Sequence, residues 1–336
     1  MKRLAFFLFL LAAPLAGQDR KQPTNSLFDD YEMKTYPPAS VMVQGEVENP
    51  GPVDLTSLPL RSAAIKELGL ENGKQVFKGS FFVSGYALCD VLNGKRPKKV
   101  AENTFVPLVD MYVIVENDRG EKAVFSWGEI YHRDSFDLLI TRTEQPVYPA
   151  RAKTTWPLPD RSRLVCGSDL LNTRFISSPT RITVKSYAGG APAAKPKDLY
   201  APQIHLATPA GSANIGDIDG PVERRNCTTV LFGHGMGFRE VLNLKGYVLR
   251  DLIASRARWV PESSKSTFFV VSAKDGYRSV FSGSEVMNRN DQEDLLLNDL
   301  GDASSGGRYT LVAPGDFFAD RDVKSVEKIE LMSIVP

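Results

Sequence analysis

Cysteine and histidine are scarce in this sequence, with three of each among 336 residues. The cysteines Cys89, Cys166 and Cys227 are odd in number and far apart, which excludes a disulfide framework and a zinc site with Cys/His spacing. One disulfide with one free thiol, or three buried thiols, would both fit this count. With so few histidines and no Gly-x-Ser-x-Gly motif, the sequence gives little support to a histidine-based hydrolase.

Neither sign of charge is in excess, since 41 lysines and arginines balance 40 aspartates and glutamates. We therefore expect no strong field that would draw the protein onto nucleic acid or an anionic membrane. Hydrophobic residues make up 42% of the chain and charged residues 24%, which is ordinary globular usage and excludes a disordered chain. No apolar run reaches the roughly 20 residues that a spanning helix needs, so no membrane span is expected after signal cleavage.

The N-terminus has the pattern of a secretory signal peptide. Lys2 and Arg3 precede an apolar run over residues 4–13, and Pro14 and small residues follow. We expect cleavage after about residue 17, with residues 18–39 forming an irregular lead-in. No second arginine adjoins Arg3, which favours the general export route over the twin-arginine route. The sequence thus predicts a secreted or periplasmic protein.

Residues 40–187 and 213–336 are predicted to be two copies of one domain, joined by an Ala-, Gly- and Pro-rich linker over residues 188–212. Short blocks recur in the same order, and their offset falls from 171 to 147, so the first copy is 24 residues longer. The matching blocks include Gly45-Glu46-Val47 with Gly216-Asp217-Ile218, Gly85-Tyr86 with Gly246-Tyr247, Val124-Phe125-Ser126 with Val280-Phe281-Ser282, Asp137-Leu138-Leu139 with Asp294-Leu295-Leu296, and Leu164-Val165 with Leu311-Val312. Much of the extra length lies between Leu139 and Leu164, in a proline-rich segment that is predicted to be a surface loop.

Each copy is predicted to consist of short strands with few, short helices. An Asp275-Gly276 pair predicts a hairpin turn in the second copy, and residues 85–92 are predicted to turn into a short helix. The expected strands cover residues 112–115, 123–126, 181–185, 267–272, 278–282 and 328–331. This pattern is typical of an α+β or mainly β domain and excludes a doubly wound α/β fold.

In their order, these landmarks resemble the molybdopterin-binding domain of the sulfite oxidase family. Such domains have a G-x-x-L-x-D segment, a D-G-Y hairpin and a closing L-V-x-P-x-D segment followed by arginine. The second copy has these motifs at residues 246–251, 275–277 and 311–316, with Arg321 following. The resemblance covers about four-fifths of the chain. It implies an α+β fold class, with two copies of a mixed, mainly antiparallel β domain and short helices.

The resemblance also implies a cysteine thiolate, ahead of the G-x-x-L-x-D segment, that ligates molybdenum. The first copy has no cysteine at that place, and in the second copy Cys227 precedes Gly246 by 19 residues. Cys227 is therefore the candidate catalytic residue and metal ligand, and a buried or paired structural cysteine is the alternative. Because its surroundings depart from the family's ligand motif, we interpret both copies as degenerate and expect no cofactor, with molybdopterin and molybdenum as the alternative.

Five residues of the second copy are candidate ligand contacts: His234, Arg239, Asp275, Tyr277 and Arg321. His234 lies in a Gly-rich stretch that could present backbone N–H groups to an anion. Each residue also has a structural interpretation. His234 and Arg239 could be exposed groups near a turn, Asp275 could bond its own turn, and Tyr277 could begin a strand. Arg321 and Asp316 recur as Arg174 and Asp169, which indicates an ion pair that serves the common fold.

The sequence favours an exported, non-catalytic protein that binds a small molecule or a protein partner. This hypothesis follows from the missing thiolate ligand, the general export signal and the lack of a repeated polar constellation. A molybdopterin-dependent oxidoreductase that uses the second copy, and a structural envelope module, are the two alternatives.

Overall fold

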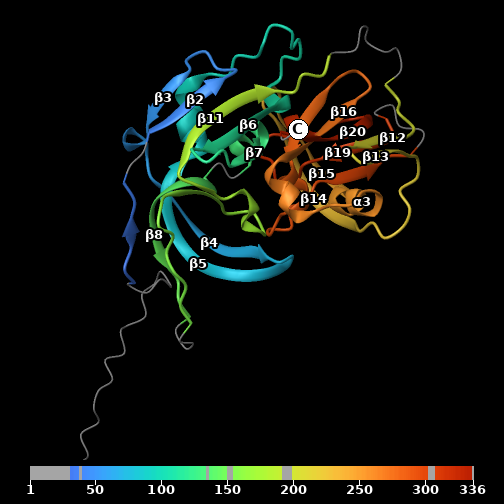
Figure 1. Ribbon diagram of the computed structural model, residues 1–336. Helices are drawn as coiled ribbons and strands as arrows, with labels where there is room; N and C mark the ends of the chain where they lie inside the picture. Colours follow the sequence, from blue (N-terminus) through green and yellow to red (C-terminus); the bar gives the residue numbers. More distant parts are fainter. Residues whose placement is uncertain are drawn as a thin grey trace, which may run out of the picture. The chain divides into compact units, whose positions relative to one another are not determined.

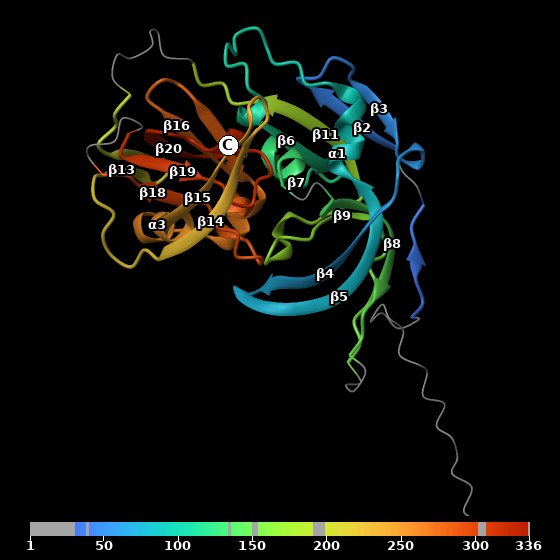
Figure 2. The same cartoon turned by 180° about the vertical axis from the view of Figure 1, so that it is seen from behind.

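The computed structural model describes residues 31–37, 40–133, 136–149, 154–190, 199–301 and 307–334. The predicted signal peptide and most of the predicted lead-in lie outside these residues. The described part is mainly β, with four small sheets arranged as a four-bladed β-propeller (Figure 1; Figure 2). The predicted α+β class, with two sulfite-oxidase-like copies, is therefore wrong.

The helices are too short to form a layer of their own, which is the physical reason for this correction. Helix α3 (Leu249–Arg256) has eight residues, and the other three α-helices have five each. These are α1 (Leu88–Leu92), α2 (Trp127–Tyr131) and α4 (Gly283–Met287). Short 3-10 turns cover Leu55–Ser57, Asn93–Lys95, Leu108–Asp110, Asn172–Arg174, Pro261–Lys265 and Ala319–Arg321. The core is therefore built by the sheets.

The first half of the chain contains two sheets. One has the order β3-β2-β11-β6-β7, and the other has the order β10-β9-β8-β5-β4, with β1 on β8. The strands of the first sheet are β2 (Ser40–Gly45), β3 (Gly51–Asp54), β6 (Met111–Asn117), β7 (Lys122–Ser126) and β11 (Pro179–Ser186). Those of the second are β1 (Lys34–Thr35), β4 (Arg61–Glu71), β5 (Lys74–Ala87), β8 (Leu138–Pro146), β9 (Arg163–Cys166) and β10 (Ile176–Ser177).

The second half repeats this strand order. Its sheets run β13-β12-β20-β16-β17 and β14-β15-β18-β19. The strands are β12 (Ile204–Thr208), β13 (Gly211–Ile215), β14 (Arg224–Gly233), β15 (Gly237–Val248), β16 (Thr267–Ala273), β17 (Arg278–Ser282), β18 (Leu296–Asp299), β19 (Tyr309–Val312) and β20 (Val326–Ser333). Most pairs are antiparallel, and one pair in each half, β2–β11 and β12–β20, is parallel. We call the two halves the first and second repeat.

Strand β12 lies inside the segment that was predicted to be a linker. Ile204 and Leu206 of this strand are buried and pack in the core of the second repeat. The second repeat therefore begins well before residue 213. The alanine- and proline-rich composition of residues 188–197 favoured a linker, but strand β12 begins at Ile204.

Two long hairpins, β4–β5 and β14–β15, were not anticipated from the sequence. Asn72 and Gly73 both have positive φ in the β4–β5 turn, which is the geometry that an Asn-Gly hairpin turn requires. Both hairpins have a register shift at matching places, between Glu67 and Leu68 and between Leu231 and Phe232. The Asn-Gly pair was the sequence signal that could have revealed the first hairpin.

A buried ion-pair cluster joins the two repeats. Arg321 donates two hydrogen bonds to Asp316, at 2.5 and 2.6 Å, and one to Glu285 at 2.7 Å. It also donates to Ser126 of the first repeat at 3.1 Å, and the Ser126 hydroxyl donates to Glu285 at 2.5 Å. Arg321 is fully buried. The predicted Asp316–Arg321 ion pair is thus present, with one serine of the other repeat added to it.

The same arrangement occurs with the repeats exchanged. Arg174 donates to Asp169 at 2.7 and 2.9 Å, to Glu129 at 2.9 Å, and to Ser282 of the second repeat at 3.1 Å. Ser126 and Ser282 also begin helices α2 and α4, each in a capping box with the glutamate three residues on. Burial raises the pKa of Glu129, although the nearby Arg174 opposes this shift.

Around the cluster, backbone and apolar contacts also join the two repeats in matching pairs. The Leu170 N–H donates to the Asn288 carbonyl at 2.8 Å, and the Phe317 N–H donates to the His132 carbonyl at 2.6 Å. Tyr112 stacks on Phe268 with ring centroids 4.5 Å apart. The two repeats are therefore held together by contacts of matching kind on both sides.

We expect Arg321→Met to lower the free energy of unfolding by about 3–5 kcal/mol, because Asp316 and Glu285 would remain buried without their cation. Arg181→Met is the matched control, since Arg181 pairs with Glu116 at the surface, and it should cost at most about 1 kcal/mol. Urea unfolding of both variants would measure this difference. Equal losses would show that the buried cluster does not hold the repeats together.

Candidate functional site

Three of the predicted ligand contacts line one cavity in the second repeat. Arg239, Asp275 and Tyr277 face a space of about 710 Å³ between hairpin β14–β15, strands β18 and β19, and the segment after Arg321. We call it the second-repeat cavity. Its lining consists of Leu199, Leu231, Gly233, Arg239, Glu240, Leu242, Ala273, Asp275, Tyr277, Asn298, Leu300, Thr310, Val312, Ala319, Asp320, Asp322, Lys324 and Ser325.

His234 lies next to this cavity without lining it. The Gly-rich stretch around His234 is the turn of hairpin β14–β15, which ends in Gly237 with positive φ. The backbone N–H of His234 donates to the Asp320 carboxylate at 3.1 Å, and its ring packs on Phe318 with centroids 5.2 Å apart. The turn therefore places one backbone donor on a carboxylate of the cavity.

Asp275 and Tyr277 have local structural roles as well as a place in the lining. The Tyr277 N–H donates to Asp275 at 2.9 Å, and the Tyr277 hydroxyl donates to the Asp320 carbonyl. Burial, followed by the charges of Asp320 and Asp322, raises the pKa of Tyr277 to about 12. The phenol thus stays protonated and acts as a fixed donor at neutral pH.

Arg321 does not line the second-repeat cavity, because its side chain points into the buried cluster. The residues on either side of it do. Asp320, Asp322 and Lys324 alternate with the buried Arg321 and Val323. Sequence reasoning missed these three residues, although their alternation with a repeated arginine was a signal that could have found them.

The charged groups of this lining are not paired with one another. Among the described residues, neither Arg239 nor Lys324 has an ion-pair partner. Asp320 and Asp322 accept hydrogen bonds from the backbone of His234 and Ala313, at 3.1 and 2.9 Å. The cavity therefore offers both carboxylates and cations to a ligand.

Cys227 lies outside the second-repeat cavity. It borders a separate shallow hollow on hairpin β14–β15, beside Asn226, Thr228, Asn243 and Lys245. Burial and the charge of Glu293 raise the pKa of its thiol, which disfavours the thiolate that molybdenum needs. Among the described residues, no group of three or more histidines, cysteines, aspartates or glutamates is placed to hold a metal. The surroundings of Cys227 thus do not fit a thiolate-ligated molybdenum cofactor.

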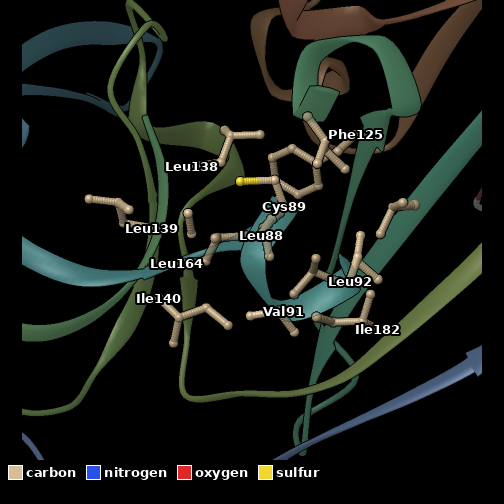
Figure 3. Close-up of a cluster of buried hydrophobic side chains, with 14 of the residues drawn as sticks. Leu88, Cys89, Val91, Leu92, Phe125, Leu138, Leu139, Ile140, Leu164 and Ile182 are labelled. Atoms are coloured by element: carbon tan, nitrogen blue, oxygen red, sulfur yellow. The ribbon is translucent and has the colours of Figure 1, made fainter. Parts of the chain in front are cut away.

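Cys89 and Cys166 belong to the core of the first repeat. Figure 3 shows Cys89 near Leu138 and Phe125, with Leu88, Val91 and Leu92 on the same short helix. Burial raises the pKa of the Cys89 thiol to about 11. Burial also raises the pKa of Cys166 well above its ordinary value. Both thiols are therefore inert at neutral pH in the folded protein.

A smaller cavity, of about 380 Å³, lies between the repeats. Arg133 and Arg289 line it, together with Asp291 and Glu293. Arg133 donates to Glu293 at 2.6 Å, and Arg289 donates to Asp291. Because its arginines are already paired with carboxylates, this cavity is a weaker candidate site.

Comparison with protein-family models finds no match for the chain, and comparison with curated protein sequences finds none either. Among the described residues, no helix has the length and apolar character that crossing a membrane requires.

We expect the contribution of Asp322 to stability to fall as the pH rises from about 4 to about 7. Burial is the main reason that the pKa of Asp322 is raised to about 7. The charge of Asp316 raises it further, whereas the hydrogen bond from Ala313 and the charges of Arg321 and Lys324 lower it. The folded state therefore keeps a proton that the unfolded state releases near pH 4. Asp322→Asn keeps the acceptor for the Ala313 N–H and removes this titration.

Urea unfolding at about pH 4.5 and about pH 8 would test this expectation. We expect the free energy of unfolding of Asp322→Asn, minus that of the wild type, to be larger at the higher pH than at the lower pH. The same difference at both pH values would contradict the assignment of a raised pKa to Asp322.

In the native protein, Cys227 should be the first thiol to react with an alkylating reagent, because it is partly exposed and the other two cysteines are buried. Mass spectrometry should find one modification before unfolding, and Cys227→Ser should remove it. Rapid labelling of Cys89 or Cys166 under native conditions would contradict the described packing of the first repeat.

Proposed function

We propose that the protein is an exported, non-catalytic binding protein whose second-repeat cavity holds a small ligand. The observation that carries this proposal is an asymmetry between the repeats. The place that is open in the second repeat is filled by the protein's own side chains in the first.

The shared landmarks locate this place in the first repeat. Leu311 and Val312 of β19 match Leu164 and Val165 of β9, so Thr310 in the cavity lining corresponds to Arg163. The matching register shifts of the two hairpins pair Leu231 with Glu67 in the same way.

Arg163 fills the equivalent space in the first repeat. Its guanidinium group donates to Glu144 at 2.9 and 3.0 Å and to Glu67 at 2.6 Å. It also lies 5.2 Å from the ring centroid of Phe81 and 5.3 Å from that of Phe175. In the second repeat, Phe175 is replaced by Asp322, because Arg174 and Arg321 match.

The longer proline-rich loop of the first repeat adds a cover. Trp156 of this loop donates to the Ser80 carbonyl at 3.0 Å and packs against Phe77. A Cβ at Gly79 would lie only 2.5 Å from the Trp156 ring. The matching loop of the second repeat is shorter, since 15 positions separate Leu296 from Leu311 whereas 25 separate Leu139 from Leu164. A smaller residue at Thr310 and a shorter loop both support an accessible binding site.

Binding is favoured over the molybdopterin-dependent alternative because Cys227 is not part of the lining. The cavity combines apolar residues with charged groups, a composition that suits recognition of a small polar molecule with an aliphatic part.

A thermal-shift screen of the mature protein against small metabolites of different charge tests this proposal. At a hundredfold excess over its dissociation constant, a ligand adds about 2.7 kcal/mol of stability, so the melting temperature should rise by about 2 °C or more. Thr310→Arg, which copies the first repeat, should abolish that rise, and Leu242→Trp is a second variant that fills the cavity. Asp160→Asn, at an exposed site of the first repeat, is the control. No shift with any compound, or equal shifts in all variants, would contradict the proposed function.

A further inference from the structure

We propose that the ligand of the second-repeat cavity carries an organic cation, either a guanidinium or an alkylammonium group. This inference rests on the proposed function and names the chemical class of the ligand.

In the first repeat, a side chain of the protein itself occupies the space that matches the second-repeat cavity. There, the chain itself places a guanidinium group in the equivalent position, between two carboxylates and two aromatic rings. Arg163 is nearly fully buried, so this site holds its cation away from water. In the second repeat, Thr310 and Leu231 stand where Arg163 and Glu67 stand in the first, and Asp322 stands in place of Phe175. The guanidinium group is thus absent from the matching space, and a carboxyl group still borders it.

The charge of the second-repeat cavity also favours a cation. Four carboxylates line it, those of Glu240, Asp275, Asp320 and Asp322, against the two cations Arg239 and Lys324. Among the described residues, none of the four carboxylates forms an ion pair with a lysine or arginine. The lining thus has more acidic than basic groups. Because the pKa of Asp322 is raised to about 7, a cationic ligand would also favour the charged form of this carboxyl group.

The depth of these groups points the same way. Asp320 and Asp322 are partly buried, whereas Arg239 and Lys324 are exposed, as are the other two acidic residues, Glu240 and Asp275. The Arg239 guanidinium lies over the backbone of Gly233, as Lys78 does over the matching Gly69 in the first repeat. A charged ligand group that reaches the inner end of the cavity therefore meets Asp320 and Asp322, whereas the exposed groups of both signs lie at the rim.

The remaining lining fits the alkyl stem of such a ligand and places an aromatic residue beside its cation. Leu231, Leu242 and Val312 provide apolar surface for methylene groups. Tyr277 lines the same space and presents an aromatic ring, the kind of surface on which a cation is stabilised.

Isothermal titration of the mature, full-length protein with three probes of similar shape tests the charge of the ligand. The probes are butylguanidinium, the neutral isostere butylurea, and the anion butanoate. We expect saturable binding of butylguanidinium at one site and no detectable binding of the other two. Asp320→Asn and Asp322→Asn should each weaken butylguanidinium binding by about tenfold or more, since each removes a charge-assisted hydrogen bond. Thr310→Arg should abolish it, and the exposed Asp160→Asn should leave it unchanged.

The outcomes separate this inference from the proposed function. Equal or tighter binding of butylurea or butanoate, or unchanged binding by both aspartate variants, would overturn the cationic ligand. If butylguanidinium does not bind while another compound stabilises the wild type and not Thr310→Arg, the cation is wrong and the binding function stands. If no compound of any charge binds in the cavity, both proposals fail.

Discussion

The two buried guanidinium groups of Arg174 and Arg321 are the interaction on which the rest of the structure depends. Each is bound by carboxylates of its own repeat and by a serine that begins a helix of the other. Because carboxylates buried without a cation are costly, these bonds leave little freedom in how the repeats meet. They also fix the segment after Arg321, which brings Asp322 to the second-repeat cavity.

On this common scaffold, the two repeats differ in one place. The first repeat fills a space between its hairpin and strand β9 with Arg163, and covers it with Trp156. The second repeat has Thr310 and a shorter loop at the matching positions, and keeps the space open. The first repeat therefore keeps its own cation inside, and we propose that the second repeat takes a ligand in the matching space. That difference is the basis of the proposed function.

Several parts of this structure could be predicted from the sequence, because they depend on residues close together or on repetition. The Asp275-Gly276 hairpin and the Asp169–Arg174 and Asp316–Arg321 ion pairs belong to this group. The fold class could not, since a turn signal such as Asn72-Gly73 marks a hairpin without showing how the sheets are arranged around it. The α+β expectation followed from a resemblance whose landmarks are turns, and turns do not specify how sheets are arranged. Arg239, Asp275 and Tyr277 were found as candidates. The importance of Thr310 was not, because it rests on the ion pairs that the matching Arg163 forms, which only the structure shows.

The most direct test of this account is chemical rescue in the first repeat. Arg163→Ala removes the internal guanidinium and leaves Glu67 and Glu144 buried without a cation. Millimolar methylguanidinium should raise the melting temperature of this variant more than that of the wild type, and methylurea should not. Equal effects of methylguanidinium on both proteins would contradict the claim that the first repeat holds a cation site that its own Arg163 fills.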